Sequence, residues 1–350
     1  MSGSSSLQKA LHGDTVQANR DNILPTRDGL DNLRAGLQLS KGVHAIKVSV
    51  TGDTSDSPEE VRLSWVSPAQ RDANHLDAIQ AAKNADTAIV FAWTRGAPVF
   101  GLPGEQNALI DEVASANPNT VVVLNTSQPI DMPWLNRVKG VVEMWWPGDQ
   151  GGQVTADVLL GKASPAGRLP FTWGKKLSDY PATDPAFPER SGKDVNGATW
   201  FSEGLDVGYR WFDRRDIEPA FPFGYGLSYT RFAYNDLAIR RSTDGELDVQ
   251  FNVSNTGKFD GDEVPQVYLG APSRADQVDA KFAVRKLSGF SRVYLKSGET
   301  KHIIMRVPLR QLQYWSVVES RWITAATGRT VYVGASSRDI RLSGQTAMKE

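Results

Sequence analysis

Residues 145–152 read Trp-Trp-Pro-Gly-Asp-Gln-Gly-Gly and join two apolar segments through a proline and three glycines. The apolar run 140–144 precedes this stretch, and the run Val158-Leu159-Leu160 follows it. Glycine and proline interrupt regular structure and mark turns of defined shape. The stretch therefore predicts a passage from a strand, through a shaped turn, into a helix.

The same alternation of strand and helix patterns extends from Asn74 to Trp173. Nearly continuous β-branched runs interspersed with amphipathic segments indicate a mostly parallel sheet covered on both faces. We expect an α/β layered sandwich here. The expected strands are 87–93, 120–124 and 140–145, and the expected helices are 75–84, 105–116 and 152–160.

The two flanks of this region differ from it in pattern. Residues 42–51 and 59–67 alternate apolar and polar side chains and predict a β-hairpin. Residues 177–222 are rich in proline, glycine and aromatic residues, which predicts a long ordered loop.

After Tyr229, short alternating runs separated by polar turns predict an all-β sandwich of fibronectin type III character. The expected strands are 247–254, 265–270, 285–294, 301–307, 321–324 and 330–334. The expected domains are 1–70, a leader with the hairpin; 71–228, the α/β sandwich with its loop; and 229–350, the β-sandwich.

Composition excludes several classes of function. The net charge is −1 without a basic tract, so we expect no nucleic-acid partner. The absence of cysteine excludes disulfides and thiolate chemistry, and the four scattered histidines argue against a zinc site. We expect no metal, no cofactor and no membrane helix, since no apolar run approaches roughly 20 residues. Residues 1–6 lack the features of a signal peptide.

In open parallel sheets, ligands bind beyond the carboxyl ends of the strands. That edge is expected to hold residues 94–96, 125–128 and 146–150, which combine guanidinium, amide, carboxylate and indole groups. Sugars suit such a mixture, because their C–H faces stack on aromatic rings and their hydroxyls need polar partners. The expected substrate-binding residues are Trp93, Arg95, Trp146 and Arg210. The alternative is that the tryptophans fill the core or a domain seam.

Glycoside hydrolysis normally needs two carboxyl groups that flank the scissile bond. The candidate catalytic residues are Glu105, Asp149 and Glu203, which all belong to expected loops or element ends. Each also has a structural interpretation: Glu105 begins a helix, where a carboxylate is favoured by the dipole, and Glu203 could pair with Arg210. The sequence contains neither a nucleophile elbow nor a phosphate-binding or dinucleotide fingerprint.

Four motifs carry a resemblance to a known family. These are residues 145–152, Pro165–Trp173 (PAGRLPFTW), Gly208–Phe212 (GYRWF) and Phe221–Thr230 (FPFGYGLSYT). Together they resemble the carboxyl-terminal half of glycoside hydrolase family 3, the β-glucosidase and β-xylosidase family, over about residues 70–345. The predicted hairpin resembles the last two strands of a β-sandwich insert of the protective-antigen type, which some members carry.

In full-length members of that family, a (β/α)₈ barrel supplies the aspartate nucleophile. An α/β sandwich follows, which often supplies the acid/base glutamate, and then a fibronectin-like domain. This chain resembles the last two domains. Residues 1–70 are too few for a barrel of about 250 residues, so the nucleophile has no matching position here. The glutamate that often precedes the Leu-Pro-Gly motif is absent near Trp93–Arg95, and Gln150 stands where a glutamate is frequent.

Three interpretations remain open. The chain is a β-glucosidase-like hydrolase with a rebuilt site, a non-catalytic carbohydrate-binding or interaction module, or an inactive fragment of a longer enzyme. A face that a barrel normally covers would tend to self-associate, which predicts a homodimer. The resemblance also implies a bacterial protein that is periplasmic or secreted.

Overall fold

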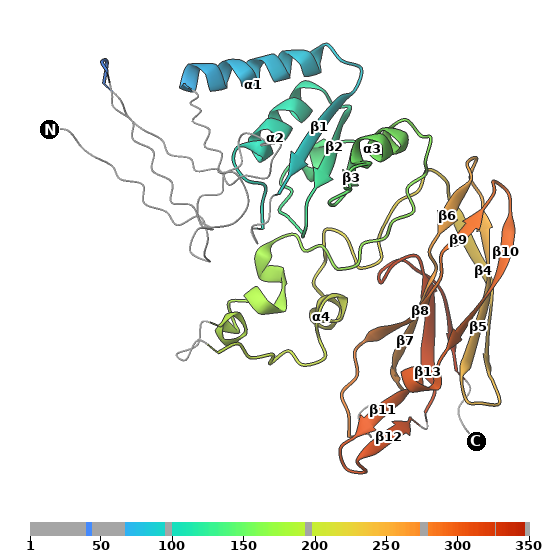
Figure 1. Ribbon diagram of the computed structural model, residues 1–350. Coiled ribbons are helices and arrows are strands. Elements are labelled where there is room, and N and C mark those ends of the chain that lie inside the picture. Colours follow the sequence, from blue (N-terminus) through green and yellow to red (C-terminus); the bar gives the residue numbers. More distant parts are fainter. Residues whose placement is uncertain are drawn as a thin grey trace, which may run out of the picture. The chain divides into compact units, whose positions relative to one another are not determined.

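The computed structural model describes residues 40–43, 67–94, 100–192, 198–273, 279–325 and 327–346 (Figure 1). The chain divides into two compact units, Met1–Pro147 and Gly148–Glu350. Nearly all of the expected β-hairpin lies outside the described residues. The expected domain boundaries after residues 70 and 228 stay predictions.

The first unit contains a three-stranded parallel sheet. Its strands are β1 (Ala88–Trp93), β2 (Thr120–Asn125) and β3 (Gly140–Glu143), which lie in that order (Figure 1). The central strand is β2, and its residues 122–124 are fully buried, as a parallel sheet requires. The expected parallel α/β domain is confirmed. The third strand is shorter than expected because Trp145 adopts a positive φ of 54°, which extended backbone does not allow.

Two helices accompany this sheet and pack on each other: α1 (Pro68–Lys83) and α2 (Gln106–Ala116). The Ser67 hydroxyl accepts the N–H of Gln70 at 3.1 Å, and Pro68 occupies the first helical position. These two signals start α1 at Pro68, before the expected His75. After β2, a short 3₁₀ helix, η2 (Leu135–Arg137), leads to β3.

The second unit begins with α3 (Gly151–Leu159). The expected ordered loop 177–222 contains short helices that sequence periodicity did not predict. They are η3 (Leu177–Asp179), η4 (Pro181–Thr183), η5 (Pro188–Ser191) and α4 (Tyr209–Arg215). Trp211 is buried and its indole N–H donates to the carbonyl of Asp179 at 3.0 Å. Aromatic side chains therefore order this segment in place of a long helix or a sheet.

The remainder of the second unit is an all-β sandwich, which confirms the fibronectin type III-like prediction. One sheet has the order β10-β5-β4 and the other β14-β13-β7-β8, with two-stranded pairs β6-β9 and β11-β12 (Figure 1). The bounds are β4 (Phe232–Arg241), β5 (Leu247–Asn255), β6 (Gly261–Glu263), β7 (Gln266–Pro272), β8 (Arg285–Phe290), β9 (Val293–Leu295), β10 (Thr300–Val307), α5 (Leu309–Leu312), β11 (Gln313–Ser316), β12 (Arg321–Thr324), β13 (Arg329–Gly334) and β14 (Ile340–Gln345).

Alternating side chains form the core of the sandwich. In β5, every second residue from Leu247 to Val253 is buried, and these side chains pack with those of the facing sheet. The single strand expected over 285–294 is two strands, because β8 pairs with β7 whereas β9 pairs with β6. Strands β4, β6, β11 and β14 were not expected.

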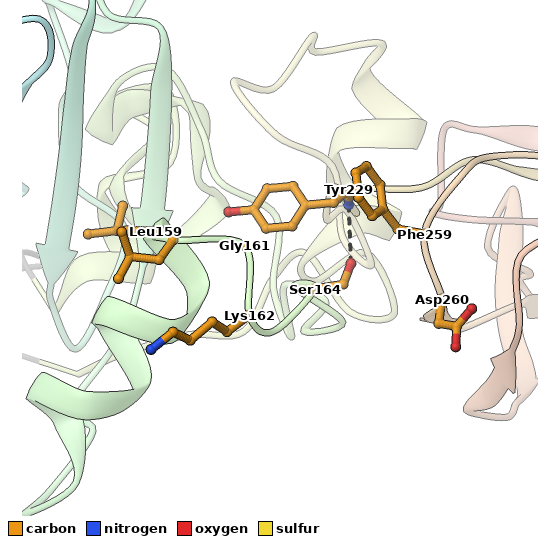
Figure 2. Close-up of a pocket in the computed structure, with 8 residues that line it drawn as sticks. Leu159, Gly161, Lys162, Ser164, Tyr229, Phe259 and Asp260 are labelled. Atoms are coloured by element: carbon orange, nitrogen blue, oxygen red, sulfur yellow. Dashed lines mark hydrogen bonds between the residues drawn. The ribbon is translucent and has the colours of Figure 1, made fainter.

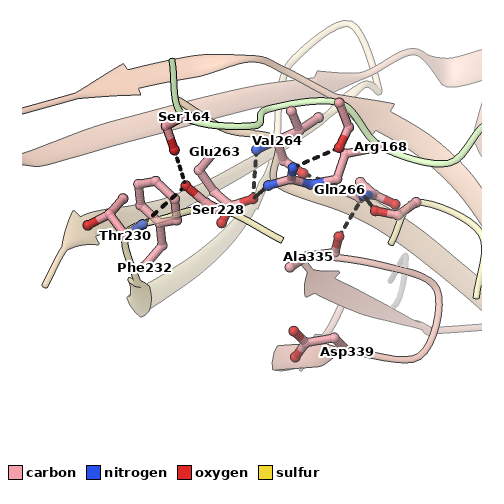
Figure 3. Close-up of polar contacts among 12 residues, drawn as sticks. Ser164, Arg168, Ser228, Thr230, Phe232, Glu263, Val264, Gln266, Ala335 and Asp339 are labelled. Carbon is pink, nitrogen blue, oxygen red and sulfur yellow. Dashed lines mark hydrogen bonds and ion pairs between the residues drawn. The ribbon is translucent and has the colours of Figure 1, made fainter. Parts of the chain in front are cut away.

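A buried polar cluster ties the segment after α3 to the sandwich (Figure 3). Arg168 donates to the carboxylate of Glu263 at 2.8 Å, and both side chains are almost completely buried. A Cβ at Gly226 would lie 2.2 Å from the carbonyl oxygen of Gly167, so this close approach requires glycine. Ser164 and Ser228 hydroxyls hydrogen-bond at 2.9 Å. The motif around residues 221–230 thus has a structural reason for its glycine and serine.

Candidate functional site

The carboxyl ends of β1, β2 and β3 meet at one edge of the sheet in the first unit. The register places Trp93 opposite Asn125 and Leu124 opposite Glu143. The N–H of Thr94 donates to the carbonyl of Asn125 at 3.1 Å, which continues the pairing one residue past β1. This edge is the place where parallel sheets bind ligands.

A buried carboxyl lies at this edge, on Glu143. Its Oε1 accepts the N–H groups of Trp145 at 2.7 Å and Thr126 at 3.3 Å, and its Oε2 lies 2.9 Å from the Thr126 hydroxyl. All three groups that bond to the carboxyl are uncharged. Glu143 was not among the expected site residues. The available signal was one acidic residue at the end of an otherwise apolar strand.

Burial raises the pKa of Glu143 from 4.5 to about 7, although the hydrogen bonds from Trp145 and Thr126 act to lower it. The Thr126 hydroxyl also lies 3.1 Å from the carbonyl of Gln128, so its one proton serves two acceptors when Glu143 is ionised. A protonated Glu143 can donate to Thr126, which leaves the threonine proton for Gln128. Both protonation states of Glu143 are therefore accessible near neutral pH.

The turn after β3 carries two tryptophans. Trp145 has a φ of 54°, and its carbonyl accepts the side-chain N–H of Asn125 at 3.2 Å. The next residue, Trp146, is 64% exposed, which is unusual for the largest apolar side chain. The expected substrate-binding residue Trp146 is therefore accessible to a ligand.

The structure also brings Trp93 and the start of α2 together. The amide of Gln106 accepts from the N–H of Trp93 at 3.0 Å and donates to its carbonyl at 3.1 Å. Glu105 directly precedes this glutamine and lies 3.8 Å from His75, whose other ring nitrogen is 2.8 Å from Glu112. Glu105 thus belongs to a surface cluster around His75, and its catalytic role stays a prediction.

The second unit holds the other expected carboxyls, Asp149 and Glu203. Asp149 is exposed in the turn before α3. The side chain of Glu203 is 6% exposed, and its Oε2 lies 3.5 Å from the guanidinium of Arg190. The pairing of Glu203 with Arg210 that the sequence allowed is therefore wrong, because Arg190 takes that place. Catalytic roles for both carboxyls stay predictions.

The remaining expected binding residues are arginines. Arg95 lies outside the described residues. Arg210 is half-buried on α4. Burial, together with the charges of Arg329 and Arg210, lowers the pKa of Lys286, so Arg210 lies near a second cation. A sugar-binding role for either arginine stays a prediction.

One cavity in the described part of the second unit lies elsewhere (Figure 2). It has a volume of about 600 Å³ and is lined by residues that include Leu160, Lys162, Tyr229, Phe259 and Asp260. None of the expected site residues lines it. Among the described residues, no cluster of three or more histidine, aspartate and glutamate side chains could hold a metal ion. Over the same residues, no helix combines the length and apolar character needed to cross a bilayer.

Comparison with known proteins places this architecture in a family. The model of the glycosyl hydrolase family 3 C-terminal domain matches residues 6–229, and that of the fibronectin type III-like domain matches residues 263–337. A β-glucosidase of Rhizobium radiobacter is 39% identical over 78% of this chain and 34% of its own length. The β-glucosidase BoGH3A of Bacteroides ovatus is 34% identical over 89% of this chain and 42% of its own length.

Solved structures agree with these matches. DesR, a β-glucosidase from Streptomyces venezuelae crystallised with D-glucose, is 40% identical, with a TM-score of 0.76 over 81% of this chain. A β-D-glucoside glucohydrolase from Trichoderma reesei is 30% identical, with a TM-score of 0.71 over 79% of this chain. The chain spans 36% and 42% of these two proteins. The family model over residues 6–229 and the relatives together show that this chain belongs to glycosyl hydrolase family 3.

Proposed function

We propose that this chain is the carbohydrate-contacting C-terminal part of a β-glucosidase-type glycoside hydrolase that acts on β-linked glucosides or short oligosaccharides. The supporting relatives are named β-glucosidases and are 34–39% identical over most of this chain. The observation that carries the proposal is the arrangement of two side chains at the sheet edge. There, the exposed indole of Trp146 follows a carboxyl, on Glu143, that can gain and lose a proton near neutral pH.

The residues of the proposed site have separate roles. Trp146 and Trp93 offer indole rings to the C–H faces of a pyranose. Arg95 and Arg210 are the proposed polar partners of sugar hydroxyls. Glu105, Asp149 and Glu203 remain the proposed acid/base or nucleophile carboxyls of this chain, and a second carboxyl can come from a segment outside these 350 residues.

Two measurements test the proposal: hydrolysis of p-nitrophenyl β-D-glucoside and binding of D-glucose by calorimetry. They are made on wild type and on Glu105→Gln, Asp149→Asn and Glu203→Gln. If one of these carboxyls is catalytic, its variant loses at least about 100-fold in kcat while still binding glucose. Activity that is equal in wild type and all three variants would show that none of the three acts in the reaction.

A second candidate function is non-catalytic carbohydrate binding. The contacts of Glu105 with His75 and of Glu203 with Arg190 favour it, because both carboxylates already have structural partners. It predicts glucose binding without turnover in wild type, and turnover only after a separate catalytic chain is added. A chain that neither binds nor hydrolyses would be an inactive fragment of a longer enzyme.

Self-association is a further part of the proposal. The strand β1 exposes Ile89 (46%) and Phe91 (52%) on one face. A homodimer that covers such a face would show a concentration-dependent sedimentation coefficient. Replacement of Phe91 by serine should then abolish the concentration dependence and leave the fold intact.

A further inference from the structure

The backbone of Trp145 is held in a conformation that a bulky residue rarely adopts. Its φ of 54° lies in the left-handed region, which is strained for a residue other than glycine. Such a residue persists only when its surroundings fix it more than once. Residues of this kind cluster at active sites and at segments that hold ligands.

Two side chains fix both peptide groups of Trp145. The Glu143 carboxyl accepts the N–H of Trp145 at 2.7 Å, and the Asn125 amide donates to its carbonyl at 3.2 Å. The carboxyl is itself held by Thr126, through the backbone N–H and the hydroxyl. The chain of contacts therefore extends from β2 and the loop after it, through Glu143, to Trp145.

The residue that follows Trp145 has an exposed side chain. Trp146 follows the strained residue directly and is 64% exposed. We propose that Glu143 is a positioning residue: its carboxyl fixes Trp145 and thereby orients the indole of Trp146 toward a neutral pyranose ring bound at the sheet edge. This inference rests on the proposed function, since it assigns a sugar to that edge.

The local chemistry favours this role over simple packing. Every residue of β3 is partly buried, and burial of a carboxyl at the end of this strand is unfavourable enough to raise the pKa of Glu143 to about 7. The carboxyl offers an acceptor to Trp145 that an apolar residue would lack. A neutral ligand is the chemical class that fits, because an indole face stacks on C–H groups and needs no opposite charge.

The first test needs no sugar. In ¹⁵N-labelled full chain, the Trp146 indole N–H resonance is identified by its loss in Trp146→Phe. We expect it to be dispersed in wild type and in Glu143→Gln, whose amide oxygen still accepts from Trp145. In Glu143→Ala it should move toward the random-coil position. The control is Glu112→Ala, which removes a half-exposed carboxyl of the same unit. An unchanged resonance in folded Glu143→Ala would overturn the inference.

The second test uses D-glucose and a double-mutant cycle. Glu143→Ala should weaken glucose binding about 10-fold in the wild-type background and have no further effect in the Trp146→Ala background. Equal losses in both backgrounds would mean that Glu143 does not act through Trp146, and would overturn the inference. If the wild type binds no glucose, the proposed function fails, and the resonance of Trp146 still decides whether Glu143 positions it.

Discussion

Glu143 and Glu203, one in each unit, differ in what surrounds the carboxyl. Among the described residues, the groups that donate to Glu143 at the sheet edge are uncharged: the N–H groups of Trp145 and Thr126 and the Thr126 hydroxyl. Glu203 lies 3.5 Å from the buried guanidinium of Arg190. Burial raises the pKa of the Glu143 carboxyl to about 7, so it can change its charge near neutral pH, whereas the Glu203 carboxyl lies in an ion pair with Arg190. The first arrangement suits binding or catalysis, and the second suits stability.

The surroundings of Arg190 reinforce this contrast. Its guanidinium lies 3.8 Å from the ring centroid of Phe187 and 5.1 Å from that of Trp211. Its Nε donates to the Ser202 hydroxyl at 2.7 Å. Cation–π contacts and hydrogen bonds of this kind stabilise a fixed positive charge. We interpret this cluster as the element that orders the described residues 187–192 and 198–211.

The largest effect is expected from removal of the ion pair between Glu203 and Arg190. Glu203→Ala leaves the charge of Arg190 buried and unpaired, so we expect the free energy of unfolding to fall by about 3–5 kcal/mol in urea titrations. Asp149→Ala, at an exposed carboxyl, is the control and should change it by less than about 0.5 kcal/mol. The double variant Glu203→Leu/Arg190→Met should recover most of the loss. A loss below about 1 kcal/mol for Glu203→Ala would contradict the comparison.

The next effect is the pH dependence of stability that Glu143 at the sheet edge should cause. The pKa of Glu143 is raised in the folded state, to about 7 from 4.5, so the folded protein holds the proton more tightly. The resulting stabilisation is complete below pH 4.5 and is lost as the pH rises through about 7, and its upper limit is about 3 kcal/mol. Wild type should therefore lose stability relative to Glu143→Gln across this window, as measured by urea unfolding at each pH. A constant difference between the two would show that the carboxyl titrates normally.

Sequence periodicity predicted much of the fold because burial imposes it. The runs 87–93 and 120–124 are β-branched on both faces and became β1 and β2 almost residue for residue. The alternation in 247–254 became β5 for the same reason. β4 was missed because its burial pattern is irregular around a bulge between Asn235 and Ala238, where Asp236 has a φ of 56°. The helices η3 to η5 were missed because each is too short to show a period.

The residues of the site were harder to predict from the sequence than the fold was. Trp93 and Trp146 were placed at the sheet edge by the rule that parallel strands end together, and the register agrees with that placement. Glu143 was missed because its position in the sequence indicates a strand residue, and the burial that raises its pKa cannot be seen in the sequence. The partner of Glu203 could not be predicted, because Arg190 and Arg210 are both close in sequence and tertiary packing selects between them.

A smaller effect is expected when the exposed indole of Trp146 is removed from the sheet edge. Trp146→Ala removes a side chain that makes little core contact, so we expect the free energy of unfolding to change by less than about 0.5 kcal/mol. Glucose binding should weaken by about 2- to 13-fold, since a stacking contact contributes about 0.5–1.5 kcal/mol. Calorimetric titration with D-glucose measures this loss. Unchanged affinity would remove Trp146 from the proposed site.

The smallest expected effects come from the removal of one hydrogen-bonding side chain in each region. Asn125→Ala removes the donor to the Trp145 carbonyl, and Ser202→Ala removes the hydroxyl that accepts from Arg190 and donates to Glu189. Each should lower the free energy of unfolding by about 1 kcal/mol. Only Asn125→Ala should also weaken glucose binding, by several-fold, because it frees the strained Trp145. If Ser202→Ala weakens binding equally, the loop of Glu203 takes part in sugar recognition, and the division between a binding carboxyl and a stabilising carboxyl fails.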